Sequence, residues 1–252
     1  MKLTLKLTPY NFAYLVYPVV YVCSIPLTLL LKRYNGTIAH TFPVNFIESY
    51  IVSNHGYMWF TGLYWILAIT LGYLPTKDTV ILTRYTKIYL INTLWILILL
   101  EWFFGSPIFE RISVFAGATC SVPGIFREYE CKDNGGEWND PFDSSSHYTF
   151  LISSSLLVWY LIVTHVSWVT DYLSSHVPDL EVGISYSPVE ETQSKVSSAY
   201  KTVRTIVEIV AVVLLGIWFI SYLTTSIFFH TIPEKLVGLI CGLVVPTLIE
   251  YI

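Results

Sequence analysis

Charged side chains are scarce in this sequence of 252 residues. They make up 13% of it, about half the roughly 25% that is usual in soluble domains. The patterns C-x-x-C and H-E-x-x-H, which mark many zinc sites, do not occur. A long low-complexity tract, a clear internal repeat and a separate polar domain are also lacking. The scarcity of charge excludes a water-soluble globule of this size. We also expect no metal, no cofactor and no nucleic acid as a partner.

Hydrophobic residues supply 54% of the chain, and the mean hydropathy is +0.59. Six apolar runs account for this, each near the roughly 20 residues that cross a bilayer as a helix. Tryptophan and tyrosine crowd the ends of the runs, as anchors at a membrane interface do. We therefore predict an all-α integral membrane protein, with a single domain of six transmembrane helices over residues 1–252. The runs lie at about 11–31, 57–74, 88–104, 148–169, 206–228 and 235–252.

Six spans place both termini on one side of the membrane. Lysine and arginine then number eight on the side of the termini and six on the other, which favours cytoplasmic termini. The glycosylation pattern Asn35-Gly36-Thr37 and the cysteines Cys120 and Cys131 fall on the second side. A disulfide between the two cysteines requires that their loop face an oxidising lumen. We therefore predict a lumenal loop at 105–147 and a cytoplasmic loop at 170–205.

His147 stands where the long lumenal loop meets the fourth span. Asp143 and Ser145 precede it, and both residue types are strong helix N-caps. The free N–H groups and the dipole at a helix N-terminus favour an anion such as phosphate. A histidine in that turn can exchange a proton with the bound phosphate. The alternative interpretation is a helix cap with an incidental interfacial histidine.

His230 closes the fifth span in the stretch Phe228-Phe229-His230-Thr231-Ile232-Pro233-Glu234-Lys235. The number of spans puts it on the same face of the membrane as His147. If the short loop turns helically, Glu234 can accept a proton from the His230 ring and fix its tautomer, which makes the ring a competent nucleophile or base. The alternative is an interfacial histidine beside a Glu/Lys pair that anchors the chain at the membrane.

Glu101 is a further candidate, because ionisable groups inside a span are costly. It either orients a catalytic histidine or extends its carboxylate to the membrane surface. His165 lies toward the cytoplasmic end of the fourth span, where we expect a packed, hydrogen-bonded side chain. Lys77 and Arg84 have the K-x6-R spacing of a phosphate-binding motif, but the topology places them opposite both histidines.

Two stretches resemble the signatures of the fat storage-inducing transmembrane (FIT) protein family. The first is Cys131-x3-Gly135-Gly136-x-Trp138-x3-Phe142-Asp143-x-Ser145-x-His147-x2-Phe150. The second is Phe229-His230-Thr231-x2-Glu234-Lys235-x2-Gly238-x3-Gly242. The six-span layout extends the resemblance over the whole chain, and the size resembles that of the shorter fungal members.

The resemblance implies a lipid-phosphatase-like helical bundle in the endoplasmic reticulum membrane, with fatty acyl-CoA and membrane lipids as its partners. The implied activity is that of an acyl-CoA diphosphatase, a hydrolase that splits the pyrophosphate of a fatty acyl-CoA into acyl 4′-phosphopantetheine and adenosine 3′,5′-bisphosphate. This activity supports lipid droplet formation and phospholipid homeostasis. The family's two catalytic histidines match His147 and His230. Glu234, Asp143, Ser145 and Glu101 are then the expected supporting residues.

The sequence departs from the pattern in two places. Ser146 stands where the family usually has glycine, which narrows the approach of a phosphate. The Ser-Arg pair that precedes the nucleophile in the wider superfamily is missing, which leaves the phosphate-binding cation open among Arg111, Arg127, Lys132 and Lys235.

Two other functions stay open. A non-enzymatic protein that binds neutral lipid, such as diacylglycerol or triacylglycerol, and partitions it into droplets needs apolar grooves but no histidine pair. A lipid transporter predicts charged residues near the bilayer midplane on facing spans, and the sequence offers almost none.

Overall fold

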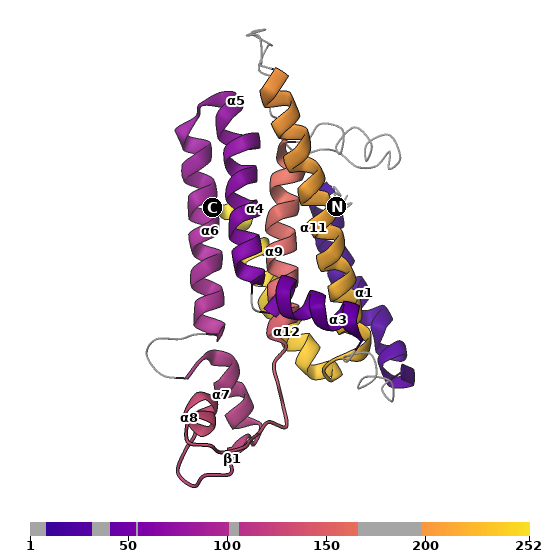
Figure 1. Ribbon diagram of the computed structural model, residues 1–252, viewed down its shortest axis with the longest axis vertical. Coiled ribbons are helices and arrows are strands. Elements are labelled where there is room, and N and C mark those ends of the chain that lie inside the picture. The colour runs from indigo at the N-terminus through magenta and orange to yellow at the C-terminus, as the bar shows by residue number, and fades with distance from the viewer. Residues whose placement is uncertain (1–8, 32–40, 54, 101–105, 166–197) are drawn as a thin grey trace, which may run out of the picture.

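The computed structural model describes residues 9–31, 41–53, 55–100, 106–165 and 198–252. These residues fold mainly into helices, with a small two-stranded sheet beside them (Figure 1). In chain order the elements are α1 (Pro9–Leu31), α3 (Phe42–Ile47), the π-helical η2 (Glu48–Ser53), α4 (Gly56–Leu67), the π-helical η3 (Ala68–Tyr73), α5 (Leu74–Thr76), α6 (Thr79–Leu100), α7 (Ile108–Phe115), β1 (Thr119–Cys120), α8 (Glu128–Asp133), β2 (Trp138–Asn139), α9 (Ser146–His165), α11 (Ser198–Phe228), α12 (Ile232–Leu248) and the 3-10 turn η4 (Ile249–Tyr251).

The described part of each predicted apolar run is almost entirely helical. Among the described residues, four segments have both the length and the hydropathy to cross a membrane. They are Tyr10–Leu31, Gly56–Thr76, Ser146–His165 and Tyr200–Phe228. A helical, multi-pass membrane protein agrees with this result, whereas six spans stay a prediction because α6 and α12 are not among the four.

Two helices begin earlier than predicted. α6 starts at Thr79 and α11 at Ser198, although their apolar runs start at about 88 and 206. The stretch 75–87 between the second and third apolar runs is therefore mostly helix. The cause is packing, which sustains a helix where hydropathy alone ends the run. Arg84 shows this, because its guanidinium lies over the Tyr160 ring and donates to the Ile249 carbonyl at 3.3 Å.

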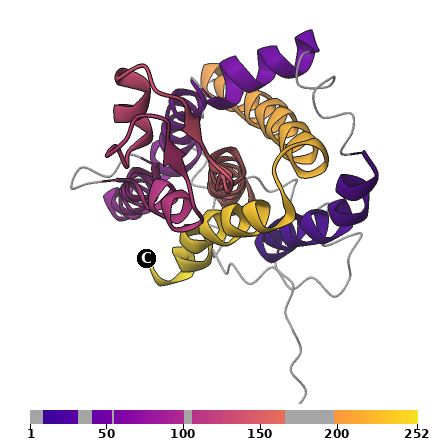
Figure 2. The same cartoon turned by 90° about the horizontal axis from the view of Figure 1, so that it is seen from below.

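Helix α9 is the centre of the bundle. Figure 2 shows it surrounded by α1, α4, α6, α11 and α12. Its most apolar stretch is 78% buried, against 22% for the corresponding stretch of α1. Three small polar residues, Ser153, Ser154 and Ser155, are buried along it and let the neighbouring helices approach closely. The site at the start of α9 therefore rests on the most enclosed element of the fold.

The first and last helices meet at one end of the bundle. The Tyr10 hydroxyl donates to the Pro246 carbonyl at 3.0 Å, which joins the start of α1 to the end of α12. His165 lies at the same end, where its Nε2 pairs with the Tyr85 hydroxyl at 2.5 Å. Its predicted role as a packed, hydrogen-bonded side chain is confirmed. Lys77 follows α5, and α5 lies at the end of the bundle opposite the segment of α7 and α8 (Figure 1).

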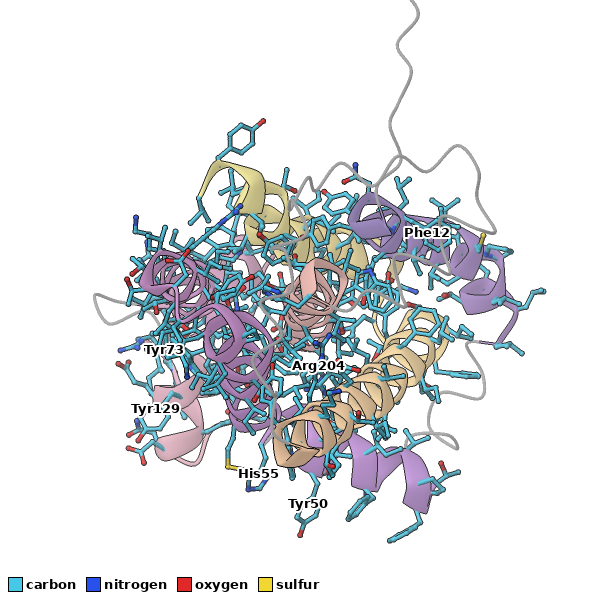
Figure 3. All side chains as sticks on the ribbon, turned by 90° about the horizontal axis from the view of Figure 1, so that it is seen from above. Phe12, Tyr50, His55, Tyr73, Tyr129 and Arg204 are labelled. Carbon is cyan, nitrogen blue, oxygen red and sulfur yellow. A yellow bond between two sulfur atoms is a disulfide. The ribbon has the colours of Figure 1, made fainter. Side chains whose placement is uncertain are left out.

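The segment formed by α3 and η2 runs across the bundle rather than along it (Figure 1). Its outer face carries an aromatic ridge in which Phe42 stacks on Phe46, Phe46 on Tyr50 and Tyr50 on His55. Figure 3 shows Tyr50 and His55 side by side, pointing away from the bundle. The predicted loop 32–56 thus contains a helical segment with one exposed aromatic face.

The predicted loop 105–147 also has structure of its own. Helices α7 and α8 flank strands β1 and β2, which pair antiparallel with Cys120 opposite Trp138 (Figure 1). Cys120 and Cys131 form a disulfide, as the sequence led us to expect. Gly136 makes this possible, because a side chain there would lie 2.8 Å from the sulfur of Cys131.

Helix α12 packs tightly against the first turns of α9. A Cβ atom on Gly238 would lie 2.7 Å from the Ser145 carbonyl, and one on Gly242 would lie 2.9 Å from Cβ of Ile152. The Thr149 hydroxyl donates to the Gly238 carbonyl at 3.2 Å across this contact. The two glycines thus hold the start of α12 against the start of α9.

Candidate active site

His230 occupies a strained position in the turn between α11 and α12. Its φ of 57° is left-handed, a region that costs a residue with a side chain about 1–2 kcal/mol. The turn forms because α11 ends at Phe228, with the N–H of Phe229 still bonded to the Thr225 carbonyl. Strain of this kind gathers at functional sites, where the surrounding structure enforces it.

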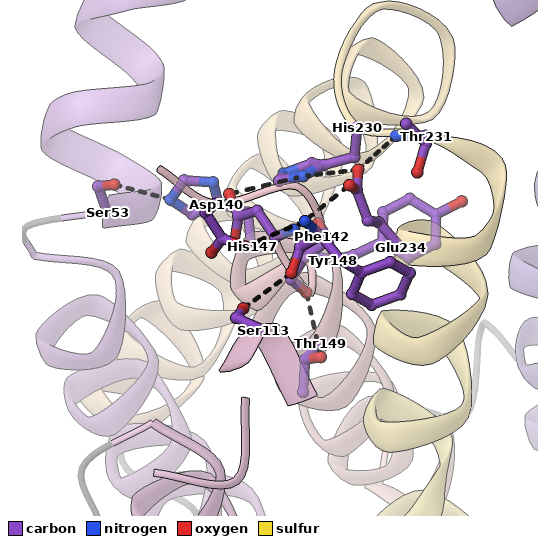
Figure 4. A network of polar contacts seen from close by, with 12 residues as sticks. Ser53, Ser113, Asp140, Phe142, His147, Tyr148, Thr149, His230, Thr231 and Glu234 are labelled. Carbon is purple, nitrogen blue, oxygen red and sulfur yellow. Dashed lines mark hydrogen bonds and ion pairs between the residues drawn. The ribbon is translucent and has the colours of Figure 1, made fainter. Parts of the chain in front are cut away.

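Two carboxylates face one nitrogen of the His230 ring. Nδ1 lies 3.8 Å from Oε2 of Glu234 and 3.9 Å from Oδ2 of Asp143. These are ion-pair distances, longer than a hydrogen bond. Glu234 is itself fixed, because its side chain accepts the N–H of Thr231 at 2.6 Å in a capping box (Figure 4). With Nδ1 turned to the carboxylates, Nε2 is the nitrogen left for a substrate.

His147 lies in the first turn of α9. The Ser145 hydroxyl accepts the N–H of Tyr148 at 3.2 Å and caps the helix, as its residue type predicted. Nε2 of His147 lies 2.8 Å from the Ser53 hydroxyl (Figure 4). The same nitrogen lies 3.5 Å from Oε1 of Glu48. Both contacts come from η2, so the segment that crosses the bundle holds this ring.

One cavity of about 360 Å³ brings the two histidines together. It opens between η2, the start of α9 and the end of α11, and Asp143 and Ser146 also line it. Its apolar wall consists of Pro43, Val44, Ile47, Val52, Ile220 and Phe229. Both histidines therefore lie at one end of the bundle, whereas the shared membrane face stays a prediction.

Two further cavities meet the first one at Ser146. One of about 350 Å³ lies beside α6 and shares Ser146, His147 and Val52. Another of about 480 Å³ lies toward α7 and α8 and shares Asp143 and Ser146. The residue that departs from the family's glycine therefore stands at the junction of all three.

Burial governs the charge of His230. It lowers the pKa of the ring, and the nearby Lys235 adds to this effect, while Glu234 and a hydrogen bond with the Asp143 backbone oppose it. Burial therefore favours the neutral ring, which is the form that a nucleophilic nitrogen needs.

Asp143 responds in the opposite direction. Its side chain remains 69% exposed, yet the protein around it displaces part of its water. This desolvation raises the pKa of Asp143 to about 6, helped by the charges of Asp140, Glu234 and Glu128 and opposed by His147. Asp143 can therefore gain or lose a proton near neutral pH.

The structure corrects the assignment of the phosphate-binding cation. Lys235 is wrong as a candidate, because it is fully buried and its Nζ donates to the Thr28 hydroxyl at 2.8 Å and the Ser226 carbonyl at 2.7 Å. It joins α1, α11 and α12 instead, since a buried ammonium group needs such acceptors. Arg111 donates to the Ser106 carbonyl on the exposed surface.

Arg127 and Lys132 remain near the site. They line the 480 Å³ cavity and pair with Glu130 and Glu128, respectively. Glu101 falls outside the described residues, so its predicted role stays a prediction. The same holds for the glycosylation pattern at 35–37 and for most of the cytoplasmic loop 170–205.

Sequence reasoning missed Glu48 and Ser53. Both lie in the stretch 32–56, which was predicted only as a loop. One signal was available, since Glu48 is the single acidic residue of that stretch. A lone carboxylate beside a span invites the question of which cation or histidine it faces.

Comparison with known proteins gives a family. The family model described as fat storage-inducing transmembrane protein matches residues 43–250, which include both histidines and nearly everything after α1. No solved structure matches the chain.

Three curated relatives carry the same activity in their names. Acyl-coenzyme A diphosphatase YFT2 of Saccharomyces cerevisiae is 26% identical over 151 residues, which are 60% of this chain and 47% of that protein. Acyl-coenzyme A diphosphatase fit1 of Schizosaccharomyces pombe is 23% identical over 64% of this chain and 54% of its own. Acyl-coenzyme A diphosphatase FITM2 of Homo sapiens is 22% identical over 70% of this chain and 58% of that protein. The chain spans about half the length of these relatives.

Proposed function

Because this chain belongs to the fat storage-inducing transmembrane protein family, we propose that it is an acyl-CoA diphosphatase, a membrane hydrolase that cleaves the phosphoric anhydride of a fatty acyl-CoA. The products are acyl 4′-phosphopantetheine and adenosine 3′,5′-bisphosphate. The observation that carries the proposal is the single cavity lined by His147 and His230. The names of the three relatives support it.

His230 is the nucleophile in this proposal. Its Nε2 attacks the phosphorus on the pantetheine side, and the bond from that phosphorus to the bridging oxygen breaks. His147 gives a proton to the oxygen that leaves with adenosine 3′,5′-bisphosphate. Water then attacks the phosphohistidine, returns a proton to His147 and releases acyl 4′-phosphopantetheine. Asp143 and Glu234 keep Nδ1 of His230 protonated, so that Nε2 carries the lone pair.

The start of α9 supplies a place for the phosphates. Ser145 caps the N–H of Tyr148, while those of Ser146 and His147 have no hydrogen-bond partner among the described residues. Free N–H groups at a helix N-terminus bind anions, and the helix dipole adds to the attraction. Arg127 and Lys132, in the adjoining cavity, are the cations in reach of the far end of the substrate.

The acyl chain takes the apolar side of the cavity, between η2 and α11. In this proposal the chain crosses the endoplasmic reticulum membrane six times, with both termini in the cytoplasm and the active site at the lumenal face. The activity supports lipid droplet formation and phospholipid homeostasis there. A map of glycosylation and thiol accessibility tests the orientation. If a thiol reagent applied from the cytoplasmic side modified the Ser121→Cys variant, the proposed orientation would be wrong.

Turnover of palmitoyl-CoA by purified protein tests the activity. The wild type is expected to release adenosine 3′,5′-bisphosphate, and His147→Ala and His230→Ala should each lose at least about 100-fold in rate. His55→Ala is the matched control, since His55 lies outside the cavity on the aromatic ridge, and should keep the rate of the wild type. Full activity of His230→Ala would refute the mechanism, and no turnover by the wild type would refute the function.

A second candidate function rests on a different cavity. An apolar groove of about 320 Å³ lies between α1, α9 and α11, lined by residues such as Phe12, Val16, Trp159 and Phe219. Such a groove suits the chains of a neutral lipid, which the protein would then partition into droplets. Diacylglycerol binding that survives the double change of His147 and His230 to alanine, without turnover by the wild type, would favour this candidate.

A further inference from the structure

Three side chains at the start of α9 form a continuous chain of polar contacts. The Ser53 hydroxyl donates its hydrogen to Oε1 of Glu48 at 2.9 Å. The hydroxyl oxygen of Ser53 also lies 2.8 Å from Nε2 of His147. A hydroxyl has one hydrogen, so with that hydrogen given to Glu48 the serine can only accept from the ring. The contacts therefore place a hydrogen on Nε2 of His147.

This arrangement differs from a catalytic triad of serine, histidine and acid. In a triad the serine and the acid contact opposite nitrogens of the ring, so that the base removes the serine proton. Here Ser53 and Glu48 both face Nε2, at 2.8 and 3.5 Å. Ser53 is thus a link between the ring and the carboxylate, and not a nucleophile.

The opposite side of the ring is free. Among the described residues Nδ1 of His147 has no hydrogen-bond partner, and the side chain is 32% exposed in the cavity. The charged groups that face the ring are Glu48 from η2, Asp143 from the loop before α9 and His230 from the turn before α12. The described residues of α6 that line the adjoining cavity are uncharged. Among the described residues, Glu48 is therefore the carboxylate that lies closest to Nε2 of His147.

We propose that Glu48 and Ser53 are positioning residues that hold His147 as the proton donor of the reaction, acting through its Nδ1. Glu48 stabilises the imidazolium form, and Ser53 fixes the ring so that the hydrogen of Nδ1 points into the cavity. When the leaving oxygen takes that hydrogen, the neutral ring keeps the hydrogen on Nε2 in its bond to Ser53. The water that attacks the phosphohistidine restores the proton to Nδ1.

The two histidines thus present different nitrogens. Carboxylates face Nδ1 of His230 and leave Nε2, whereas η2 occupies Nε2 of His147 and leaves Nδ1. This assignment of nitrogens rests on the proposed function, which supplies acyl-CoA as the substrate. It makes His147 the histidine that donates the proton.

The pH dependence of palmitoyl-CoA hydrolysis tests the proposal. Glu48→Gln removes the charge that stabilises the imidazolium, so the alkaline limb of the kcat profile should move to lower pH by about one unit. Ser53→Ala should lower kcat about tenfold with little change in KM, and Ser53→Thr, which restores the hydroxyl, should recover most of it. Tyr50→Phe, which removes a hydroxyl from the outer face of the same segment, should change neither quantity. A kcat loss in Glu48→Gln with an unmoved limb, or no loss at all, would overturn the proposal.

A second measurement needs no turnover. Nitrogen-15 NMR of histidine-labelled protein in nanodiscs, with His147 assigned from the signal missing in His147→Gln, should show neutral His147 with its hydrogen on Nε2. Ser53→Ala should shift the ring toward a mixture of tautomers. If the wild type carried the hydrogen on Nδ1, the proposed role of Glu48 and Ser53 would be wrong even if acyl-CoA is hydrolysed. If the tautomer is as expected and acyl-CoA is not hydrolysed, the proposed function fails, but Glu48 and Ser53 still position the His147 ring.

Discussion

The N–H of Asp143 donates a hydrogen bond to Oε1 of Glu234 at 3.3 Å, across 91 residues of sequence. Through this bond the entrance of α9 is attached to the first turn of α12. The same glutamate caps α12 by accepting the N–H of Thr231. One side chain thus sets the distance between the segments that carry His147 and His230.

Glu234 is expected to have separable structural and chemical roles. Glu234→Ala removes both accepted hydrogen bonds, so it should lower the free energy of unfolding by about 1 kcal/mol, the usual cost of a lost cap. Glu234→Gln keeps one accepting oxygen, so it can retain only one of the bonds from Thr231 and Asp143 and should be destabilised less than Glu234→Ala. Its hydrolysis rate should also fall, because His230 loses a facing charge. Thermal unfolding in detergent and initial rates measure the two effects. A Glu234→Ala protein as stable as the wild type would contradict the capping role.

The left-handed backbone of His230 predicts an inverted order of two variants. Glycine adopts φ near 57° without strain, so His230→Gly should be more stable than His230→Ala by about 1 kcal/mol, while both are inactive. His147 is the matched control. It lies inside a helix, where glycine is less stable than alanine by about 0.5–1 kcal/mol. Melting temperatures of the four proteins give the comparison. If glycine were less stable than alanine at both positions, the backbone strain at His230 would be contradicted.

Asp143 predicts a pH dependence of stability. Its pKa of about 6 in the folded protein exceeds the ordinary 3.8, so the folded state binds the proton more tightly than the unfolded chain. The contribution of this group to the unfolding free energy is therefore greatest below about pH 4, falls as the pH rises to about 6 and is constant above. Asp143→Asn is neutral throughout, so it should gain melting temperature relative to the wild type between pH 4 and pH 6.5. Asp133→Asn, at an exposed position on α8, serves as the control, and parallel melting curves for Asp143→Asn and wild type would contradict the shift.

The contact between α12 and α9 predicts which glycines tolerate a side chain. Gly238→Ala places a methyl group 2.7 Å from the Ser145 carbonyl, so it should destabilise the fold by about 1–3 kcal/mol and reduce hydrolysis by moving His230. Gly216, on α11, has open space around it. Gly216→Ala should therefore be neutral or stabilising by up to about 1 kcal/mol, because alanine favours the helix. Detergent melts of both variants decide, and an unaffected Gly238→Ala would show that the helices can separate without loss.

The sequence predicted the meeting of the two histidines for a simple physical reason. Apolar runs report membrane spans, and an even or odd count of spans assigns each loop to a face without any knowledge of packing. The cap at Ser145 was equally local, since its hydroxyl accepts an N–H three residues further along the chain. These features depend on short stretches of chain, which one sequence displays directly.

The predictions that failed all depended on tertiary contacts. Lys235 has the sequence of an interfacial cation, yet α1 and α11 cover it and supply acceptors from residues far away in the chain. Glu48 and Ser53 reach His147 because η2 crosses the bundle, and Ser53 is 94 residues from its partner. The early start of α6 likewise depends on Arg84 finding α9 and η4. Hydropathy describes a residue against solvent or lipid, and it carries no information about such neighbours.

The segment of α3 and η2 has one more consequence. Its outer face is the ridge of Phe42, Phe46 and Tyr50, and its inner face carries the two residues that hold His147. Aromatic rings prefer the headgroup level of a bilayer, so the ridge sets how deeply the segment sits there. Because the two faces belong to one helical segment, any displacement of the rings would also displace the two side chains that contact His147.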